Sequence, residues 1–226
     1  MQSKPKTNKI ALCHSHLQLR LTQNNNDEFT AELLDKSGGN SHKNPYTVAS
    51  AVAYALAGKE RFAGQLRCRG YSVLHHCFLA YATAKQFNFS NDVVRQCLLH
   101  DIGEAFFVDI ATPHKIGIDR AREEAIVKEL TEVLGFNIEL HNPEVGKIDS
   151  MCAVIEAYTF GWDWQWPLQD ISTYYRDELD MLTFMRDYIK KFAHPTYEPL
   201  LYNVNYNETT NLIKTYPSIL QELGVL

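Results

Sequence analysis

The chain has 226 residues, enough for one domain with a full hydrophobic core or for one domain and a tail. Its 45% hydrophobic and 22% charged residues are typical of a soluble globular protein. The formal net charge of -5 argues against a protein that coats nucleic-acid polymers, because such proteins are usually basic. No apolar run reaches the roughly 18 residues of a membrane span, and the first residues lack a signal-peptide core, so no membrane contact is expected. The five cysteines, an odd number, favour reduced thiols and a cytoplasmic location.

The first 44 residues are expected to form an N-terminal extension. Leucines alternate at positions 17, 19 and 21, and the turn-like NNND and a second partly apolar run follow. This pattern predicts a small β-hairpin within residues 8–34. The polar stretch DKSGGNSHKN, residues 35–44, is typical of a linker or loop. We therefore expect an extension over residues 1–44 and a helical domain over residues 45–226.

Helical periodicity dominates the rest of the chain and predicts an all-α fold. Helices are expected at about residues 45–58, 72–87, 91–108, 119–134, 143–160, 171–192 and 208–222. Glu129 and the other glutamates of the fourth helix are interpreted as a solvated face. Residues 192–206 are expected to form an ordered loop, because prolines there block a regular helix. Trp162, Trp164 and Trp166 alternate, which favours core packing over a pocket cover or an oligomer contact.

His100 and Asp101 are adjacent in the segment LLHDIGEAFFVDIATPHK, and both side chains are of metal-binding types. They project from the predicted helix at different angles, so both reach one ion only if that helix lines a pocket. Glu104 follows one turn later and Asp109 two turns later. A His-Asp pair alone also fits an ordinary helix end with exposed acids. The apolar residues around it favour a metal site, because a buried acid needs a cation or a donor.

Two distant segments contain the further ligands that a metal site needs. In YSVLHHCFLAYATAK, Ser72 is a candidate helix cap, and His75 and His76 fall in the first turns of the helix. In NPEVGKIDSMCAVIEAYTFG, Asp149 shares one helix face with Glu156 and small apolar residues. Each segment alone fits a packed histidine or a solvated acid, so the prediction depends on the three segments together.

The order His, then His-Asp, then Asp on three helices resembles the HD-domain metal-dependent phosphohydrolases. The segments RFAGQLRCRGYSVLHHCFLA, LLHDIGEAFFVDIATPHK and VGKIDSMCAVIEA are similar to segments of the small bacterial and phage members. The resemblance is to bacterial 5'-deoxynucleotidases and phage deoxyadenosine triphosphate triphosphohydrolases, over roughly residues 45–166. It implies an all-α HD-domain helical bundle, here with a small β-hairpin before it.

The resemblance implies one metal ion and its ligands. His76, His100, Asp101 and Asp149 match the metal-binding positions. His75 stands where many relatives have Gln or Glu, and it fits either a partner of the site or an ordinary packed or solvent-facing histidine. The mixed nitrogen and oxygen ligands suit Co, Mn, Fe, Ni, Zn or Mg.

Further positions match residues that act on the substrate. Glu104 and Asp109 match catalytic or substrate-orienting acids. Arg61 matches a phosphate-contacting arginine at the pocket mouth, and Phe62 an aromatic residue near the nucleoside. Lys115 matches the basic residue after the Thr-Pro turn.

Motif variants exclude other members of the superfamily. Guanosine tetraphosphate hydrolases carry an acidic pair after the signature, whereas Ala105 follows Glu104 here. Cyclic-nucleotide phosphodiesterases and di-iron oxygenases have a further His soon after the signature, but the next one here is His114, beyond a proline. One metal is therefore expected rather than two.

The expected function is metal-dependent hydrolysis of nucleotide phosphate esters, most simply of deoxynucleoside 5'-monophosphates to nucleoside and phosphate. One alternative is a triphosphohydrolase that releases triphosphate from deoxynucleoside triphosphates. An alternative of another class is a non-catalytic, nucleotide-binding regulatory protein. The expected partners are a small-molecule nucleotide and further copies of the chain in a homo-oligomer.

Overall fold

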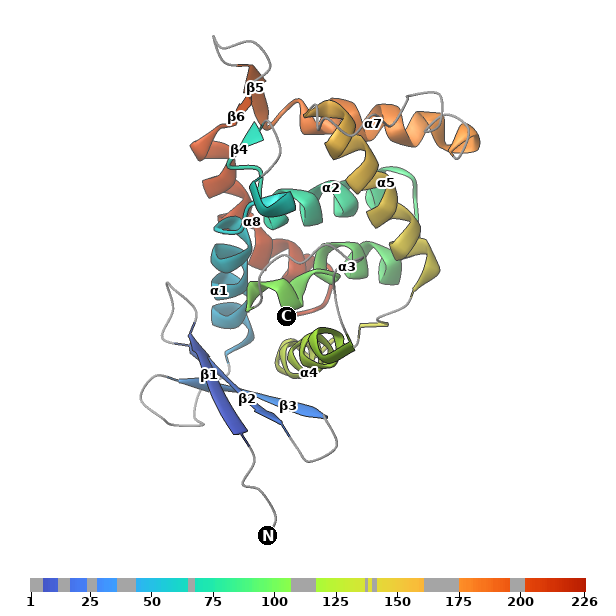
Figure 1. The fold of residues 1–226 in the computed structure, drawn as a ribbon. Coiled ribbons are helices and arrows are strands. Elements are labelled where there is room, and N and C mark those ends of the chain that lie inside the picture. The colour runs from blue at the N-terminus through green and yellow to red at the C-terminus, as the bar shows by residue number, and fades with distance from the viewer. Residues whose placement is uncertain are drawn as a thin grey trace.

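The computed structural model describes residues 6–11, 17–23, 28–35, 44–64, 68–106, 117–136, 138–139, 142–160, 175–195 and 202–226. Most of these residues are helical, and a three-stranded sheet lies at the N-terminal end (Figure 1). The expectation of a mainly helical protein with an N-terminal hairpin is confirmed, with one strand more than expected. Within the described ranges, no helix is both long and apolar enough to span a membrane.

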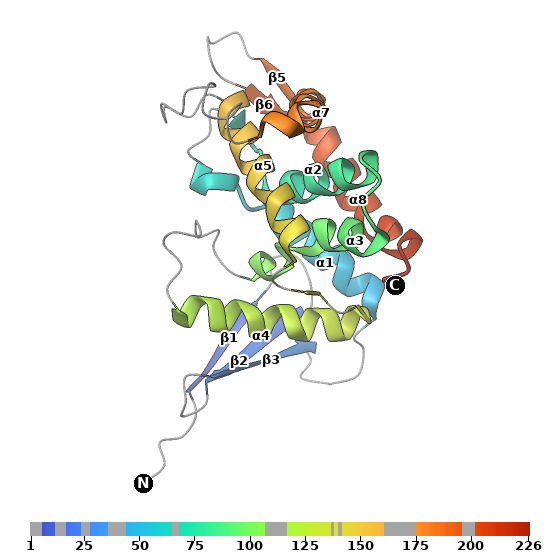
Figure 2. The ribbon, with the colours of Figure 1, turned by 90° about the vertical axis from the view of Figure 1, so that its right-hand side faces the viewer.

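The N-terminal sheet is an antiparallel meander in the order β1-β2-β3. Its strands are β1 (Lys6–Ala11), β2 (Leu17–Gln23) and β3 (Phe29–Asp35). Leu19 pairs with Leu33, and both are buried. The sheet packs against helix α4 (Gly117–Leu134), above all through β3 (Figures 1 and 2). Its leucines belong to the same hydrophobic core as the helices.

Glu129 of α4 does not lie on a solvated face, so that interpretation is wrong. Its side chain is buried, and its Oε1 accepts a hydrogen bond from the backbone N–H of Leu33 at 2.7 Å. Strand β3 is an edge strand, whose outward N–H groups lack a partner within the sheet. Glu129 pairs one of them and ties the sheet to α4.

The remaining helices form the body of the protein, and most begin at a side-chain cap. Asn44, Ser90, Asn142 and Asn205 each accept hydrogen bonds from backbone N–H groups of the first turn. The helices are α1 (Pro45–Ala57), α2 (Val73–Gln86), α3 (Asn91–Leu99), α5 (Pro143–Thr159), α7 (Leu179–Ile189) and α8 (Tyr206–Glu222). These ranges agree with the predicted helices except after Leu99 and before Leu179.

The predicted helix over residues 91–108 is interrupted. Helix α3 ends at Leu99, His100 and Asp101 form a turn, and the short 3-10 helix η2 (Ile102–Ala105) follows. Gly103 explains the close approach of η2 to α4, since a Cβ there would lie 3.0 Å from side-chain atoms of Glu123 and Val127. This turn, rather than a continuous helix, presents the His-Asp pair to the interior.

A second small sheet and two short helices complete the described structure. Strands β4 (Cys68–Arg69), β6 (Tyr202–Val204) and β5 (Ala193–Pro195) pair in the order β4-β6-β5. The predicted loop over residues 192–206 therefore contains two short strands. The 3-10 helices are η1 (Arg61–Gly64) and η4 (Arg176–Glu178), and η4 precedes α7. The three tryptophans at 162, 164 and 166 lie outside the described residues.

The thiols agree with the expectation of reduced, packed cysteines. Cys68, Cys77, Cys97 and Cys152 are free and buried. Burial raises the pKa of Cys68 to about 12, so its thiol stays protonated and poorly reactive at neutral pH. Cys13 lies outside the described residues.

Candidate metal centre

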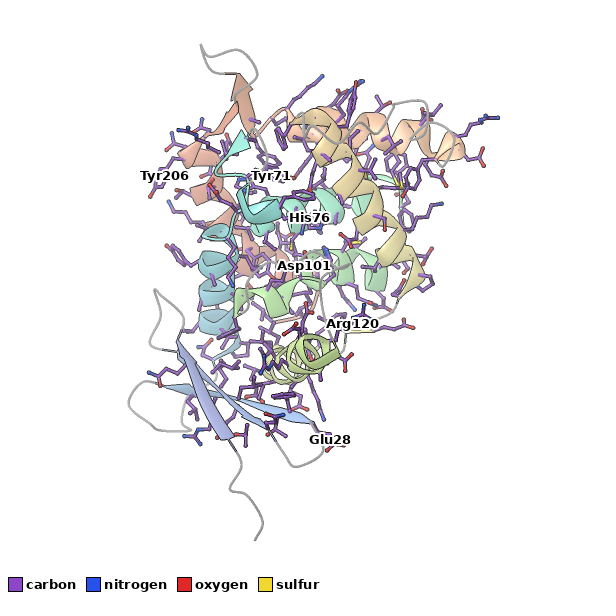
Figure 3. The ribbon with its side chains drawn as sticks, viewed as in Figure 1. Glu28, Tyr71, His76, Asp101, Arg120 and Tyr206 are labelled. Atoms are coloured by element: carbon purple, nitrogen blue, oxygen red, sulfur yellow. The ribbon has the colours of Figure 1, made fainter. Side chains whose placement is uncertain are left out.

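Three segments bring four predicted ligands together in the middle of the helical body. His76 comes from α2, His100 and Asp101 come from the turn after α3, and Asp149 comes from α5. Figure 3 shows His76 and Asp101 near the centre of the molecule, at the level of α2 and just above η2. Ligand atoms of His76, His100 and Asp101 all lie within 4.8 Å of one another.

Short distances connect the ligand atoms. Nε2 of His76 lies 3.1 Å from Nε2 of His100 and 2.9 Å from Oδ1 of Asp149. Oδ2 of Asp101 lies 3.7 Å from the first nitrogen and 3.4 Å from the second. Oδ1 of Asp149 lies 3.6 Å from Nε2 of His100. Ligand atoms at about 2.0–2.2 Å from one ion would be about 3.0–3.5 Å apart, so these separations suit a single metal.

The hydrogen bonds of the two rings decide which nitrogens face each other. Nδ1 of His100 lies 2.9 Å from the carbonyl oxygen of Cys97, which can only accept, so this nitrogen carries the hydrogen. Nδ1 of His76 donates in the same way to the carboxylate of Glu156, at 2.7 Å. If both rings are neutral, each Nε2 then has a lone pair, and the two lone pairs face each other. That approach is repulsive unless a cation or a proton lies between them.

The carboxylate of Asp101 supports a cation at the same place. Its Oδ2 is buried and has no hydrogen-bond partner, although two imidazoles and the Arg61 guanidinium surround it. A buried carboxylate oxygen without a donor is costly, and a divalent ion would satisfy it. The residues present therefore fit a metal held by His76, His100, Asp101 and Asp149.

The pKa values of the metal-free protein also indicate that the site favours positive charge. Burial acts to lower the pKa of His76, but the carboxylates of Glu156 and Asp149 raise it to about 10. Burial acts to raise the pKa of Asp149, but hydrogen bonds from both rings hold it well below its usual value. The site thus stabilises positive charge at its centre, which protons supply when no metal is bound.

Glu156 and Tyr71 complete the surroundings of His76, and the sequence did not single out either as a site residue. Glu156 is fully buried, and its Oε1 accepts hydrogen bonds from His76 and, at 2.9 Å, from the hydroxyl of Tyr71. A carboxylate on the outer nitrogen fixes the orientation of a metal-binding histidine. The position of Glu156 on the same helix face as Asp149, two turns further on, was the available signal.

Arg61 and Phe62 lie in η1, beside the metal centre. The Arg61 side chain is 10% exposed, with Nη1 3.6 Å from Oδ2 of Asp101 and Nε 3.6 Å from Oε2 of Glu156. Its guanidinium also stacks 5.1 Å from the ring centroid of Phe62. Phe62 is partly buried against the core and has a left-handed backbone with φ 53°, which strains a residue other than glycine. The Arg61 guanidinium is thus largely buried beside Asp101, one of the predicted metal ligands.

Glu104 lies one 3-10 turn after Asp101, and the residue is 3% exposed. Burial raises the pKa of the Cys77 thiol, and the charges of Asp101 and Glu104 raise it further. Because Cys77 follows His76 in α2, both acids border the same interior region. Asp109 and Lys115, the other two predicted substrate-site residues, lie outside the described residues.

His75 belongs to the helix cap and not to the cluster of ligands. Its Nδ1 accepts a hydrogen bond from the backbone N–H of Ser72 at 3.1 Å, and its Nε2 lies 3.3 Å from the hydroxyl of Thr209. The ring is fully buried, and burial lowers its pKa to about 4, so it stays neutral at physiological pH. Of the two adjacent histidines, the structure thus places His76 at the site.

A cavity of about 380 Å³ opens beside the metal centre, between α3 and the start of α5. His100 and Asp149 line it, and the Asp149 side chain is 42% exposed, whereas the Asp101 side chain is 16% exposed. Among the described residues, Asp149 is thus the predicted ligand most open to solvent. Compared with known proteins, the chain matches no protein-family model and no curated protein.

Proposed function

We propose that the protein is a metal-dependent phosphohydrolase that acts on nucleotides, most directly on deoxynucleoside 5'-monophosphates. The observation that carries the proposal is the arrangement of Nε2 of His76 and Nε2 of His100, which face each other at 3.1 Å beside Asp101 and Asp149. A divalent ion bound by two imidazoles and two carboxylates lowers the pKa of a water molecule and neutralises charge that develops on phosphorus. The resemblance to HD-domain phosphohydrolases supplies the substrate class.

Two other residues near the site, Glu104 and Arg61, are proposed to transfer a proton and to supply positive charge. Hydrolysis joins a water oxygen to phosphorus and breaks the bond from phosphorus to the sugar oxygen. One group must take a proton from the water, and one must give a proton to the leaving oxygen. Glu104 is proposed for one of these steps, because its buried carboxyl group comes one 3-10 turn after Asp101 in the chain. Arg61 adds positive charge beside Asp101 and is proposed to contact a phosphate oxygen.

A product analysis tests the proposal and separates its alternatives. Protein stripped of metal and resupplied with Mn, Co, Mg or Zn is incubated with nucleoside monophosphates and triphosphates. Phosphate released from deoxynucleoside monophosphates is the expected result. Triphosphate released from triphosphates would identify a triphosphohydrolase instead. Nucleotide binding without any release, with every metal, would contradict the enzyme and indicate a regulatory protein.

A further inference from the structure

The α3 wall of the cavity beside the metal centre contains a polar side chain whose oxygen has no hydrogen-bond partner. Gln96 and His100 lie one helical turn apart and both line the cavity. Gln96 is 5% exposed, and its Oε1 is buried without a hydrogen-bond partner. A buried amide is costly when unpaired, so an apolar side chain of the same shape would make the protein more stable here. This loss of stability has an explanation if the Gln96 carboxamide forms its hydrogen bond only when a ligand occupies the cavity.

The α5 wall contains a glycine, Gly146, whose missing side chain leaves the cavity open. Gly146 lies in the first turns of α5 and lines the cavity, and a Cβ at this position would meet no atom within 4 Å. Glycine inside a helix is less favourable than alanine. Glycine is not required here by the backbone, because Gly146 has no left-handed φ and no atom lies close to where its Cβ would be. Its effect is to keep the cavity wide next to Asp149, one turn further along α5.

The charges of the lining show what kind of group the cavity accepts. Glu139 and Asp149 are acidic, and the described lining residues include no lysine or arginine. Ile138 and Val145 add apolar surface. Such a lining repels an anionic phosphate chain and accepts a neutral group with apolar faces and a polar edge. About 380 Å³ is within the usual range of small-molecule sites.

We propose that this cavity holds the uncharged organic part of the phosphate ester, a nucleoside, and that Gln96 determines specificity by hydrogen bonding to its polar edge. The proposal rests on the proposed function, because it is the metal at His100 and Asp149 that places the phosphate at the mouth of the cavity. The carboxamide carries one donor end and one acceptor end, and rotation of its terminal bond exchanges them. Either end can pair with the polar edge of a nucleoside and neither with an apolar group, so Gln96 selects a nucleoside over an apolar group.

Binding of nucleosides that lack a phosphate tests the cavity without any need for turnover. Metal-loaded wild type, Gln96→Met and Gly146→Leu are titrated calorimetrically with the four deoxynucleosides. We expect the wild type to bind at least one of them, Gln96→Met to bind it about tenfold or more weakly, and Gly146→Leu to lose binding. Gln86→Met, an exposed glutamine of α2, is the matched control. Gly146→Ala, which adds one methyl group and favours the helix, checks that substitution of this glycine leaves the fold intact.

A kinetic comparison applies the same idea to the reaction. The ratio of kcat/KM for a deoxynucleoside monophosphate to kcat/KM for phenyl phosphate should fall about tenfold or more in Gln96→Met. The melting temperature of this variant should stay equal or rise, whereas a merely structural glutamine would lower it when replaced. A ratio that is unchanged in Gln96→Met but falls in Phe62→Ala would place the nucleoside against Phe62 and overturn the proposal. So would a wild type that binds no deoxynucleoside.

The two proposals fail separately. If deoxynucleosides bind in a manner that depends on Gln96 but no phosphate is released with any metal, the cavity assignment stands and the proposed function fails. If phosphate is released while Gln96→Met leaves binding and substrate ratio unchanged, the proposed function stands and the cavity assignment fails.

Discussion

The carboxylate of Glu156 accepts the Nδ1 hydrogen of His76 at 2.7 Å, and this bond fixes which nitrogen of His76 faces the metal centre. With one hydrogen held on Nδ1, Nε2 is the nitrogen available to a metal or, without one, to a proton shared with Oδ1 of Asp149 at 2.9 Å. The same carboxylate oxygen accepts a second hydrogen bond from Tyr71. Glu156 therefore orients His76, one of the predicted metal ligands.

The first prediction removes the charge of this carboxylate and keeps its shape. Glu156→Gln should lower the affinity for a divalent metal by about 10- to 100-fold, because the neutral amide supports the orientation and basicity of His76 less well. Affinity is measured by competition with a chelating dye. Glu144→Gln, an exposed position of the same helix, is the control and should bind metal as the wild type does. Equal affinities in both variants would show that Glu156 only packs against His76.

The second prediction concerns pH. The pKa of His76 in the folded, metal-free protein is about 10, above the ordinary value of 6.5. Its contribution to stability is therefore fully present below pH 6.5 and is lost as the pH rises through about 10. A metal must displace this proton, so metal affinity should increase with pH over the same window.

Calorimetric titration of metal at pH 7, in two buffers of different ionisation enthalpy, measures the displaced proton. About one proton or more should be released for each metal bound. Thermal unfolding of the chelated protein should show a falling melting temperature between pH 6.5 and 10, the window given by the pKa of His76. Metal binding without proton release would mean that His76 is already neutral or is not a ligand.

Much of the site could be predicted from the sequence, because its chemistry lies in residue types that stand out locally. His76, His100, Asp101 and Asp149 were chosen from three segments, and the structure brings these side chains together. The turn at His100 was not visible, and neither was the close approach of η2 to α4 at Gly103. A pattern of helical periodicity carries no information on a contact of that kind.

Two glutamates show why partners at long range escape a local pattern. Glu156 gains its role from His76, which lies on another helix, and Glu129 gains its role from the edge of β3. From its own stretch of sequence, each of the two glutamates is indistinguishable from an ordinary acid on a helix. Only the packing of the two elements decides whether such an acid is solvated or buried.

The third prediction separates proton transfer from metal binding. Glu104→Gln should keep the metal but lower turnover by roughly 10²- to 10⁴-fold, since Glu104 is proposed to handle a proton of the water or of the leaving oxygen. Metal content and phosphate release are measured on the same sample. Glu124→Gln on the exposed part of α4 should leave both unchanged. A Glu104→Gln protein that loses its metal while keeping turnover would reverse the assigned roles.

The fourth prediction concerns the contact between the sheet and α4. Glu129→Ala should lower the free energy of unfolding by about 1–3 kcal/mol, because the buried N–H of Leu33 loses its acceptor. Denaturant unfolding measures the change, and Glu132→Ala, an exposed position of α4, should alter stability much less. Equal losses in the two variants would show that the hydrogen bond contributes nothing specific.

The last prediction uses the two adjacent histidines as a matched pair. His76→Gln should lose metal and activity, because His76 contacts His100 and Asp149 directly. His75→Gln should keep both, since a glutamine at this position can still accept the Ser72 backbone hydrogen bond that His75 accepts.

The most direct test measures phosphate release from a deoxynucleoside 5'-monophosphate by chelated wild type, His75→Gln and His76→Gln, before and after addition of Co or Mn. We predict that chelation abolishes release, that metal restores it in the wild type and in His75→Gln, and that metal does not restore it in His76→Gln. Release that persists after thorough chelation, or that metal restores in His76→Gln as fully as in His75→Gln, would contradict a catalytic metal at this site.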